Sequence, residues 1–227
     1  MRSQQSPLET TWVLALAKNK EEAQMCGRYH VTDETAYEME KLIKETAEKL
    51  RWESAAALKR ISSMDIHPAD EAPVLLAAGG GIACTWLRWG FPVQQEQRKG
   101  LIINARCETV TDRPLFREGI LHRRIAVPAA SFYEWNREKA KYTFRKNDGQ
   151  ALFMTGCCRN YGDGEHFVIL TTAANESMEP VHDRMPLLLQ AEQVTEWILD
   201  AGKTEPLLRQ IPFLLERSTE YEQLRFF

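Results

Sequence analysis

Alternating apolar and polar residues dominate the middle of the chain and predict a series of strands. The runs are separated by turn-forming residues, of which Asn147-Asp-Gly and Gly162-Asp-Gly are the clearest hairpin signals. The predicted strands cover residues 101–106, 124–128, 131–135, 142–146, 151–158 and 166–172. Upstream, two further strands are expected on either side of the triple glycine at 79–81, and a short strand at 26–31.

A helical period appears towards both ends of the chain. Thr32 and Asp33 are suited to cap a helix whose apolar stripe follows the i, i+3, i+7 pattern of one buried face: Ala36, Met39, Ile43, Ala47 and Leu50. Further helices are predicted at 54–61, 114–119 and 191–199, with a shorter one from Glu205. Adjacent strands with helices at both ends favour an α+β fold, with a mostly antiparallel, twisted or barrel-like sheet and flanking helices.

No repeat or low-complexity linker divides the chain, so residues 26–227 are expected to form a single domain. Residues 1–25 are expected to be an N-terminal extension: a leader, a mistaken start or a processed segment. Their longest apolar run, 12–17, is too short to cross a bilayer and makes a poor secretory signal. We therefore expect no membrane association.

Composition is that of a globular protein, with 44% hydrophobic and 27% charged residues among 227. The five cysteines have no metal-binding spacing, which favours a reduced, cytoplasmic protein without a metal. The net charge is −3, yet residues 98–146 hold twelve Lys or Arg against five Asp or Glu. Such a segment can supply phosphate contacts, or it can be a solvated face balanced by acidic helices.

Cys26 is the first candidate for chemistry. If the chain begins at Met25 and the methionine is removed, Cys26 carries a free α-amine beside its thiol. An α-amine has a pKa near ~7.8, against ~10.4 for lysine, so far more of it is nucleophilic at neutral pH. Such an aminothiol condenses with an aldehyde to an imine, which the thiol closes to a thiazolidine. The alternative is that Cys26 is a small buried residue within a strand.

Three further segments carry polar side chains in apolar surroundings. Asn104 and Arg106 alternate on a predicted strand, so both point to one face, where an amide and a guanidinium suit a phosphosugar; a surface ion pair is the alternative for Arg106. Glu134 lies within an aromatic run, where desolvation raises a carboxyl pKa and suits it to acid/base catalysis, unless it lies on a polar strand face. His182 precedes a strand and can either shuttle protons or merely complete a loop.

The order of these motifs resembles the SOS response-associated peptidase (SRAP) family. The matching segments are Met25-Cys-Gly-Arg-Tyr, Trp89-Gly-Phe, Asn104-Ala-Arg-x-Glu108, Phe132-Tyr-Glu-Trp135 and His182-Asp-Arg-x-Pro186. The resemblance implies a sensor and shield of abasic sites in single-stranded DNA, forming a covalent thiazolidine crosslink through N-terminal Cys26 after removal of residues 1–25. It implies self-cleavage that releases Cys26, no cofactor, and association with the nucleoid on damaged DNA. We expect a monomer.

The same resemblance assigns roles to individual residues. Cys26 is the nucleophile, Asn104 orients the opened sugar, and Glu134 and His182 handle protons. Phosphate contacts fall to Arg28, Arg106 and Arg184, and base stacking to Trp135 and Trp89. The chain departs from the family pattern at Asp65-Ile-His-Pro68, where Asn-x-Ala-Pro is usual. It also departs in its short C-terminus, where some end-strand packing or a DNA contact is expected to be missing.

Two other functions are consistent with the sequence. A cysteine peptidase would use Cys26 as an internal nucleophile with His182 and either Asn104 or Glu134. Against it, Cys26 begins a predicted strand, whereas a catalytic cysteine usually profits from a helix N-terminus. A non-covalent module for single strands would use the basic segment and the aromatic residues, and its binding would be sensitive to salt.

Overall fold

The computed structural model describes residues 27–46, 48–93 and 100–219. The helices are α2 (Asp33–Thr46), α3 (Glu48–Leu58), α4 (Pro114–His122), α5 (Ala191–Leu199) and α6 (Thr204–Leu208), with 3-10 turns η1 (Cys107–Thr109) and η2 (Ala201–Lys203). The strands are β1 (Tyr29–Val31), β2 (Met64–Ile66), β3 (Glu71–Ala78), β4 (Gly81–Trp89), β5 (Phe91–Pro92), β6 (Leu101–Ile102), β7 (Asn104–Arg106), β8 (Arg124–Ala129), β9 (Ser131–Trp135), β10 (Lys141–Arg145), β11 (Leu152–Tyr161), β12 (Gly164–Ala173), β13 (Arg184–Pro186), β14 (Leu188–Leu189) and β15 (Glu216–Thr219).

Five strands form a closed ring of pairings. β12 pairs with β4, β4 with β3, β3 with β8, β8 with β11, and β11 pairs back with β12. Only the β4–β12 contact of this ring is parallel. The strands β7, β13 and β14 extend the barrel sheet. The predicted α+β class with a mostly antiparallel, barrel-like sheet is therefore confirmed.

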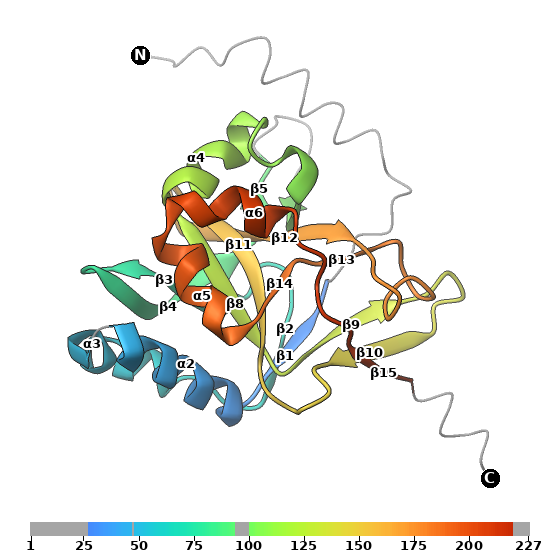
Figure 1. The fold of residues 1–227 in the computed structure, drawn as a ribbon, viewed down its shortest axis with the longest axis horizontal. Coiled ribbons are helices and arrows are strands. Elements are labelled where there is room, and N and C mark those ends of the chain that lie inside the picture. The colour runs from blue at the N-terminus through green and yellow to red at the C-terminus, as the bar shows by residue number, and fades with distance from the viewer. Residues whose placement is uncertain (1–26, 47, 94–99, 220–227) are drawn as a thin grey trace.

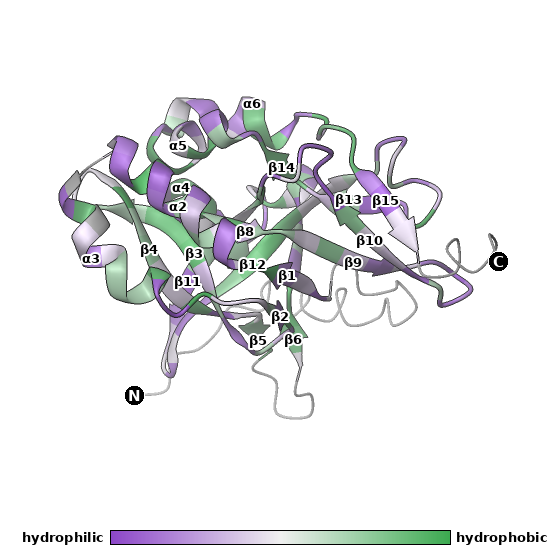
Figure 2. Cartoon of the chain, turned by 90° about the horizontal axis from the view of Figure 1, so that it is seen from below, coloured by the Kyte–Doolittle hydropathy of each residue, from purple (hydrophilic) through white to green (hydrophobic). Residues whose placement is uncertain are grey.

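A second sheet has the order β15-β10-β9-β1-β2, and all of its pairings are antiparallel. In Figure 1 it lies on the side of the molecule opposite α4, α5 and α6. One of its faces is buried in the core through Tyr29, Phe132 and Phe144, while alternate residues face outward. In Figure 2, strands of the barrel such as β3 and β8 contain green, apolar stretches, whereas the helices alternate between purple and green residues.

Side-chain hydrogen bonds attach the helices to the barrel. Ser54 of α3 accepts from the Cys84 amide at 3.0 Å, and the Trp86 indole donates to the Ala57 carbonyl at 2.9 Å. On the other helical layer, the Trp197 indole of α5 donates to the Ile125 carbonyl of β8 at 2.9 Å. These bonds satisfy polar groups that packing would otherwise strand in the core.

Several predicted boundaries were wrong. Helix α3 begins at Glu48, so Leu50 and Ser54 belong to one helix instead of ending one and starting another. Strand β2 was missed, because a three-residue strand shows too short an alternation to be recognised. Near the C-terminus, β15 pairs with β10 along the whole of Glu216–Thr219, so end-strand packing is present in the described part of this segment. His182 directly precedes β13, as predicted.

Candidate active site and nucleic-acid interface

Strand β9 carries two of the predicted site residues on opposite faces. Tyr29 pairs with Phe132 and His30 with Ser131, and the Tyr133 amide donates to the Arg28 carbonyl at 3.0 Å. Side chains alternate along a strand, so Glu134 faces the core with Phe132, whereas Trp135 faces outward with Tyr133.

Glu134 is 3% exposed and shares its face with Phe132 and Phe144, whose rings stack at a centroid distance of 5.2 Å. The predicted burial of this carboxyl group among aromatic residues is confirmed. Burial of a carboxylate costs free energy unless neighbouring groups compensate, which is why such residues are common in catalytic sites. The acid/base role itself stays a prediction.

The outward face gathers cations and aromatic rings. The Arg28 guanidinium lies 5.2 Å and the Lys141 ammonium 4.0 Å from the centre of the Tyr133 ring. Beside them, Trp135 is 38% exposed at the end of β9. An exposed indole among cations is suited to stack on a base whose phosphates are held nearby.

Asp65 of β2 accepts hydrogen bonds from several side chains of this outward face. Its carboxylate accepts hydrogen bonds from Arg28, from His30 Nδ1 at 2.8 Å and from the Tyr133 hydroxyl at 3.1 Å. Partial burial opposes ionisation, but these donors outweigh it, and the pKa of the Asp65 carboxyl lies below its usual value. Arg28 is therefore paired with a carboxylate.

The other predicted residues flank β12 in the barrel sheet. Asn104 and Arg106 lie on β7, which runs parallel to β12 and pairs Asn104 with Ile169. Asn104 is half-buried and Arg106 is exposed, with the buried Ala105 between them. This alternation matches the predicted common face of the amide and the guanidinium.

Arg184 of β13 reaches across β12 towards η1. Its Nη1 and Nη2 donate to the two carboxylate oxygens of Glu108 at 2.6 and 2.9 Å, and Nη2 also donates to the Thr171 carbonyl at 2.6 Å. The hydrogen bond from Arg184 leads the causes that hold the Glu108 pKa below its usual range, and the charge of Arg106 contributes. Arg106, Arg184 and Glu108 therefore form one group of charged side chains beside β12.

His182 is fixed next to the same arginine. Its Nδ1 lies 3.0 Å from the Arg184 amide nitrogen and 3.0 Å from the Asp183 carboxylate. These two contacts hold the imidazole beside Arg184, and its role in proton transfer stays a prediction.

The structure contradicts the stacking role predicted for Trp89. Its side chain is 0% exposed, so it offers no ring face to a nucleic-acid base. It contacts the Tyr29 ring at 5.2 Å, and its indole donates to the Ile103 carbonyl at 3.1 Å. Trp89 therefore fixes the spacing between β1 and the start of β7, and with it the spacing between the two groups of site residues.

Cys26 lies outside the described residues, so its predicted position is not described. Within the described part of the chain, no three metal-ligating side chains cluster. The helices described include none long and apolar enough to span a membrane.

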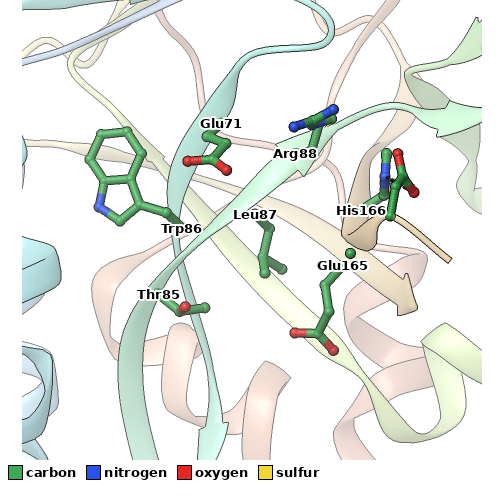
Figure 3. A pocket seen from close by; sticks show the side chains of 9 residues that line it. Glu71, Thr85, Trp86, Leu87, Arg88, Glu165 and His166 are labelled. Carbon is green, nitrogen blue, oxygen red and sulfur yellow. Dashed lines mark hydrogen bonds and ion pairs between the residues drawn. The ribbon is translucent and has the colours of Figure 1, made fainter. Parts of the chain in front are cut away.

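A recess of about 190 Å³ opens elsewhere, between β3, β4 and the start of β12 (Figure 3). None of the predicted site residues lines it. Its buried His166 contacts the Gly90 carbonyl at 2.7 Å and Asp163 at 3.1 Å, so its ring nitrogens already have partners within the protein.

Sequence reasoning assigned no role to three residues of these clusters: Asp65, Tyr133 and Glu108. Asp65 was noticed only as a departure from a family pattern, and Glu108 only as part of a motif. Asp65 lies 37 residues from Arg28 and Glu108 lies 76 from Arg184 along the chain. A sequence pattern over a few neighbouring residues cannot reveal ion pairs between residues so far apart along the chain.

Comparisons with known proteins agree on one family. The model of the SOS response associated peptidase (SRAP) family matches residues 25–225. The abasic site processing protein YoaM of Bacillus subtilis is 34% identical over 156 residues, which are 63% of this chain and 68% of that protein. YedK of Escherichia coli, also named an abasic site processing protein, is 32% identical over 117 residues, covering 48% of this chain and 52% of its own.

Solved structures support the fold. A protein from Bacteroides thetaiotaomicron superposes with a TM-score of 0.68 at 19% identity, covering 86% of this chain and 91% of that one. A phage-related protein from Bordetella bronchiseptica gives a TM-score of 0.64 at 22% identity, with 86% and 93% coverage. With a family model matching nearly its whole length, the chain belongs to the SRAP family.

Proposed function

We propose that this protein senses and shields abasic sites in single-stranded DNA by forming a thiazolidine with Cys26. The observation that carries the proposal is the seating of β1 between β2 and β9. Extending the Tyr29–Phe132 register by two residues sets Gly27 against Glu134. The chain therefore enters this sheet beside a buried carboxyl group, one residue after Cys26.

The chemistry needs an aldehyde, which an abasic deoxyribose supplies when its ring opens. The Cys26 amine adds to the aldehyde carbon, and loss of water gives an imine. The thiol then adds to the same carbon, and the nitrogen takes up the proton. Glu134 and His182 transfer protons in ring opening and dehydration, and Asn104 orients the opened sugar.

DNA binding uses basic and aromatic side chains of both sheets. Arg28 on one sheet and Arg106 with Arg184 on the other hold phosphates on either side of the abasic site, and Trp135 stacks on a neighbouring base. Relatives named as abasic site processing proteins support the proposed activity, and the family match begins at Met25. Residues 1–25 are absent from the active form, after translation from Met25 or cleavage of the Met25–Cys26 bond with Glu134 as the base.

The test uses protein that begins at Cys26, mixed with an oligonucleotide carrying one abasic site. We expect a band on a denaturing gel that survives heating and is absent with intact DNA. Cys26→Ala keeps the amine and loses the thiol, so its weaker band should require borohydride to persist. Cys84→Ala removes a buried cysteine far along the chain and should crosslink normally. A heat-stable band of full strength from Cys26→Ala would refute the thiazolidine.

A further inference from the structure

Four side chains, those of Arg28, Asp65, His30 and Ser63, form a continuous hydrogen-bonded chain on the outward side of the five-stranded sheet. His30 Nδ1 lies 2.8 Å from Asp65 Oδ1, and His30 Nε2 lies 3.2 Å from the Ser63 hydroxyl. Arg28 Nε donates to Asp65 Oδ2 at 2.8 Å. The chain thus links an arginine proposed to bind phosphate to an imidazole that can change its charge.

The partners fix which nitrogen of His30 can titrate. Asp65 is ionised, because its pKa lies below the usual value, and an ionised carboxylate only accepts hydrogen bonds. His30 Nδ1 must therefore carry a proton in either charge state. A hydroxyl can donate or accept, so Ser63 can serve a neutral Nε2 and a protonated one equally well. The cluster accommodates both states of His30 without moving.

The net charge beside Arg28 depends on the protonation state of His30. The Asp65 carboxylate neutralises Arg28, so with His30 neutral the pair presents no net charge to a phosphate. Protonated His30 restores one positive charge. Of the other groups facing the pair, burial and the charge of Asp65 raise the pKa of Tyr133, and the Lys141 ammonium lies 4.0 Å from the centre of the Tyr133 ring.

The arrangement also has the order of a serine, a histidine and a carboxylate, as in a hydrolytic triad. However, Arg28 and Tyr133 donate to the same carboxylate and lower its basicity towards His30. The cluster is therefore better suited to hold charge than to activate Ser63 as a nucleophile.

We propose that Asp65 is a positioning residue that couples phosphate binding at Arg28 to proton uptake at His30 Nε2. A DNA phosphate beside Arg28 stands close to the Asp65 carboxylate, and the proton on His30 relieves the repulsion. The DNA complex then binds more protons than the free protein, so affinity rises as pH falls. The inference rests on the proposed function, because it assumes that Arg28 binds DNA.

The test measures equilibrium binding of a fluorescent single strand without an abasic site, so that no covalent step intervenes. Anisotropy titrations at constant ionic strength should give a Kd about three- to tenfold higher near pH 8.5 than near pH 5.5. His30→Gln should remove most of this dependence. Asp65→Asn, which keeps size and removes charge, should bind more tightly at the higher pH and vary little with pH.

His67→Gln is the matched control, since His67 lies just beyond β2 and contacts the exposed Asp70 at 3.6 Å. It should keep the dependence of the wild-type protein. Equal pH dependence in His30→Gln and wild type would overturn the proposal, and so would unchanged or weaker binding by a folded Asp65→Asn. Failure of every variant to bind single strands at any pH would instead refute the proposed function.

Discussion

At the scale of single residues, the site depends on the alternation of β9. Glu134 is directed into the core and Tyr133 and Trp135 to the surface, so neighbouring positions provide a desolvated acid and an exposed binding face. A helix would have spread these three residues over adjacent positions of its surface. A strand places the proposed catalytic residue, Glu134, on one face and the proposed binding residues, Tyr133 and Trp135, on the other.

Glu134→Gln should slow crosslinking to abasic DNA by about 10² to 10⁴, the usual worth of general acid/base catalysis. The amide keeps the volume and removes the titrating proton. Glu138→Gln changes an exposed residue in the turn after β9 and should leave the rate unaltered. Single-turnover rates from quenched gels give the comparison, and a folded Glu134→Gln with the wild-type rate would make Glu134 structural.

The sequence predicted which residues belong to the site better than it predicted whether each of them is buried or exposed. Burial of Glu134 followed from its aromatic neighbours, and the common face of Asn104 and Arg106 from strand alternation. Trp89 could not be placed in the same way, because an indole suits both a core and a stacking surface. Only the fold shows that its ring is enclosed between Tyr29 and Phe167.

At the scale of elements, one buried arginine explains where two helices stop. Arg124, at the start of β8, donates to the Ile120 and Leu121 carbonyls of α4 and to the Trp197 and Ile198 carbonyls of α5. The last carbonyls of a helix have no partners within it. A guanidinium can satisfy several of them and also favours the negative end of each helix dipole.

Arg124→Met should lower the free energy of unfolding by about 2 to 4 kcal/mol, because buried carbonyls lose charged donors. Urea denaturation followed by circular dichroism measures the loss. Arg123→Ala, which removes the neighbouring partially exposed partner of Glu165, should cost less than about 1 kcal/mol. Equal losses in the two variants would show that the capping bonds contribute little.

Element prediction succeeded where the patterns were long. The β3–β4 hairpin and the strands β11 and β12 have enough residues for alternation and turn chemistry to agree. The short strands β2 and β15 pair with β1 and β10, which lie far from them along the chain, and a sequence window does not contain those partners. The closure of the barrel is likewise a long-range property.

At the scale of the whole molecule, the proposed site joins two sheets. Arg28, Glu134 and Trp135 belong to the five-stranded sheet, and Asn104, Arg106 and Arg184 to the barrel sheet. Trp89 holds the sheets in register through Tyr29 and Ile103. A nucleotide bound between the two sheets would contact both, and the buried Trp89 side chain helps to set their spacing.

The intact 227-residue chain should form no stable adduct with abasic DNA. With Met25 attached, the Cys26 nitrogen is an amide whose lone pair is delocalised, so it cannot condense with an aldehyde. Full-length protein and protein beginning at Cys26 can be assayed side by side, with each N-terminus read by mass spectrometry. An irreversible adduct at Cys26 of a chain still intact from Met1 would refute the mechanism.

The pairing of β1 with β9 has a consequence for the order of events during synthesis. During synthesis, the β9 side of β1 stays unpaired until Phe132, about 100 residues later in the chain, has been made. At the usual elongation rates this takes roughly 5 to 20 seconds. During that interval Tyr29 has no partner on its β9 side. Under the proposed function, translation from Met25 would leave these seconds for removal of the methionine before this edge of β1 is covered.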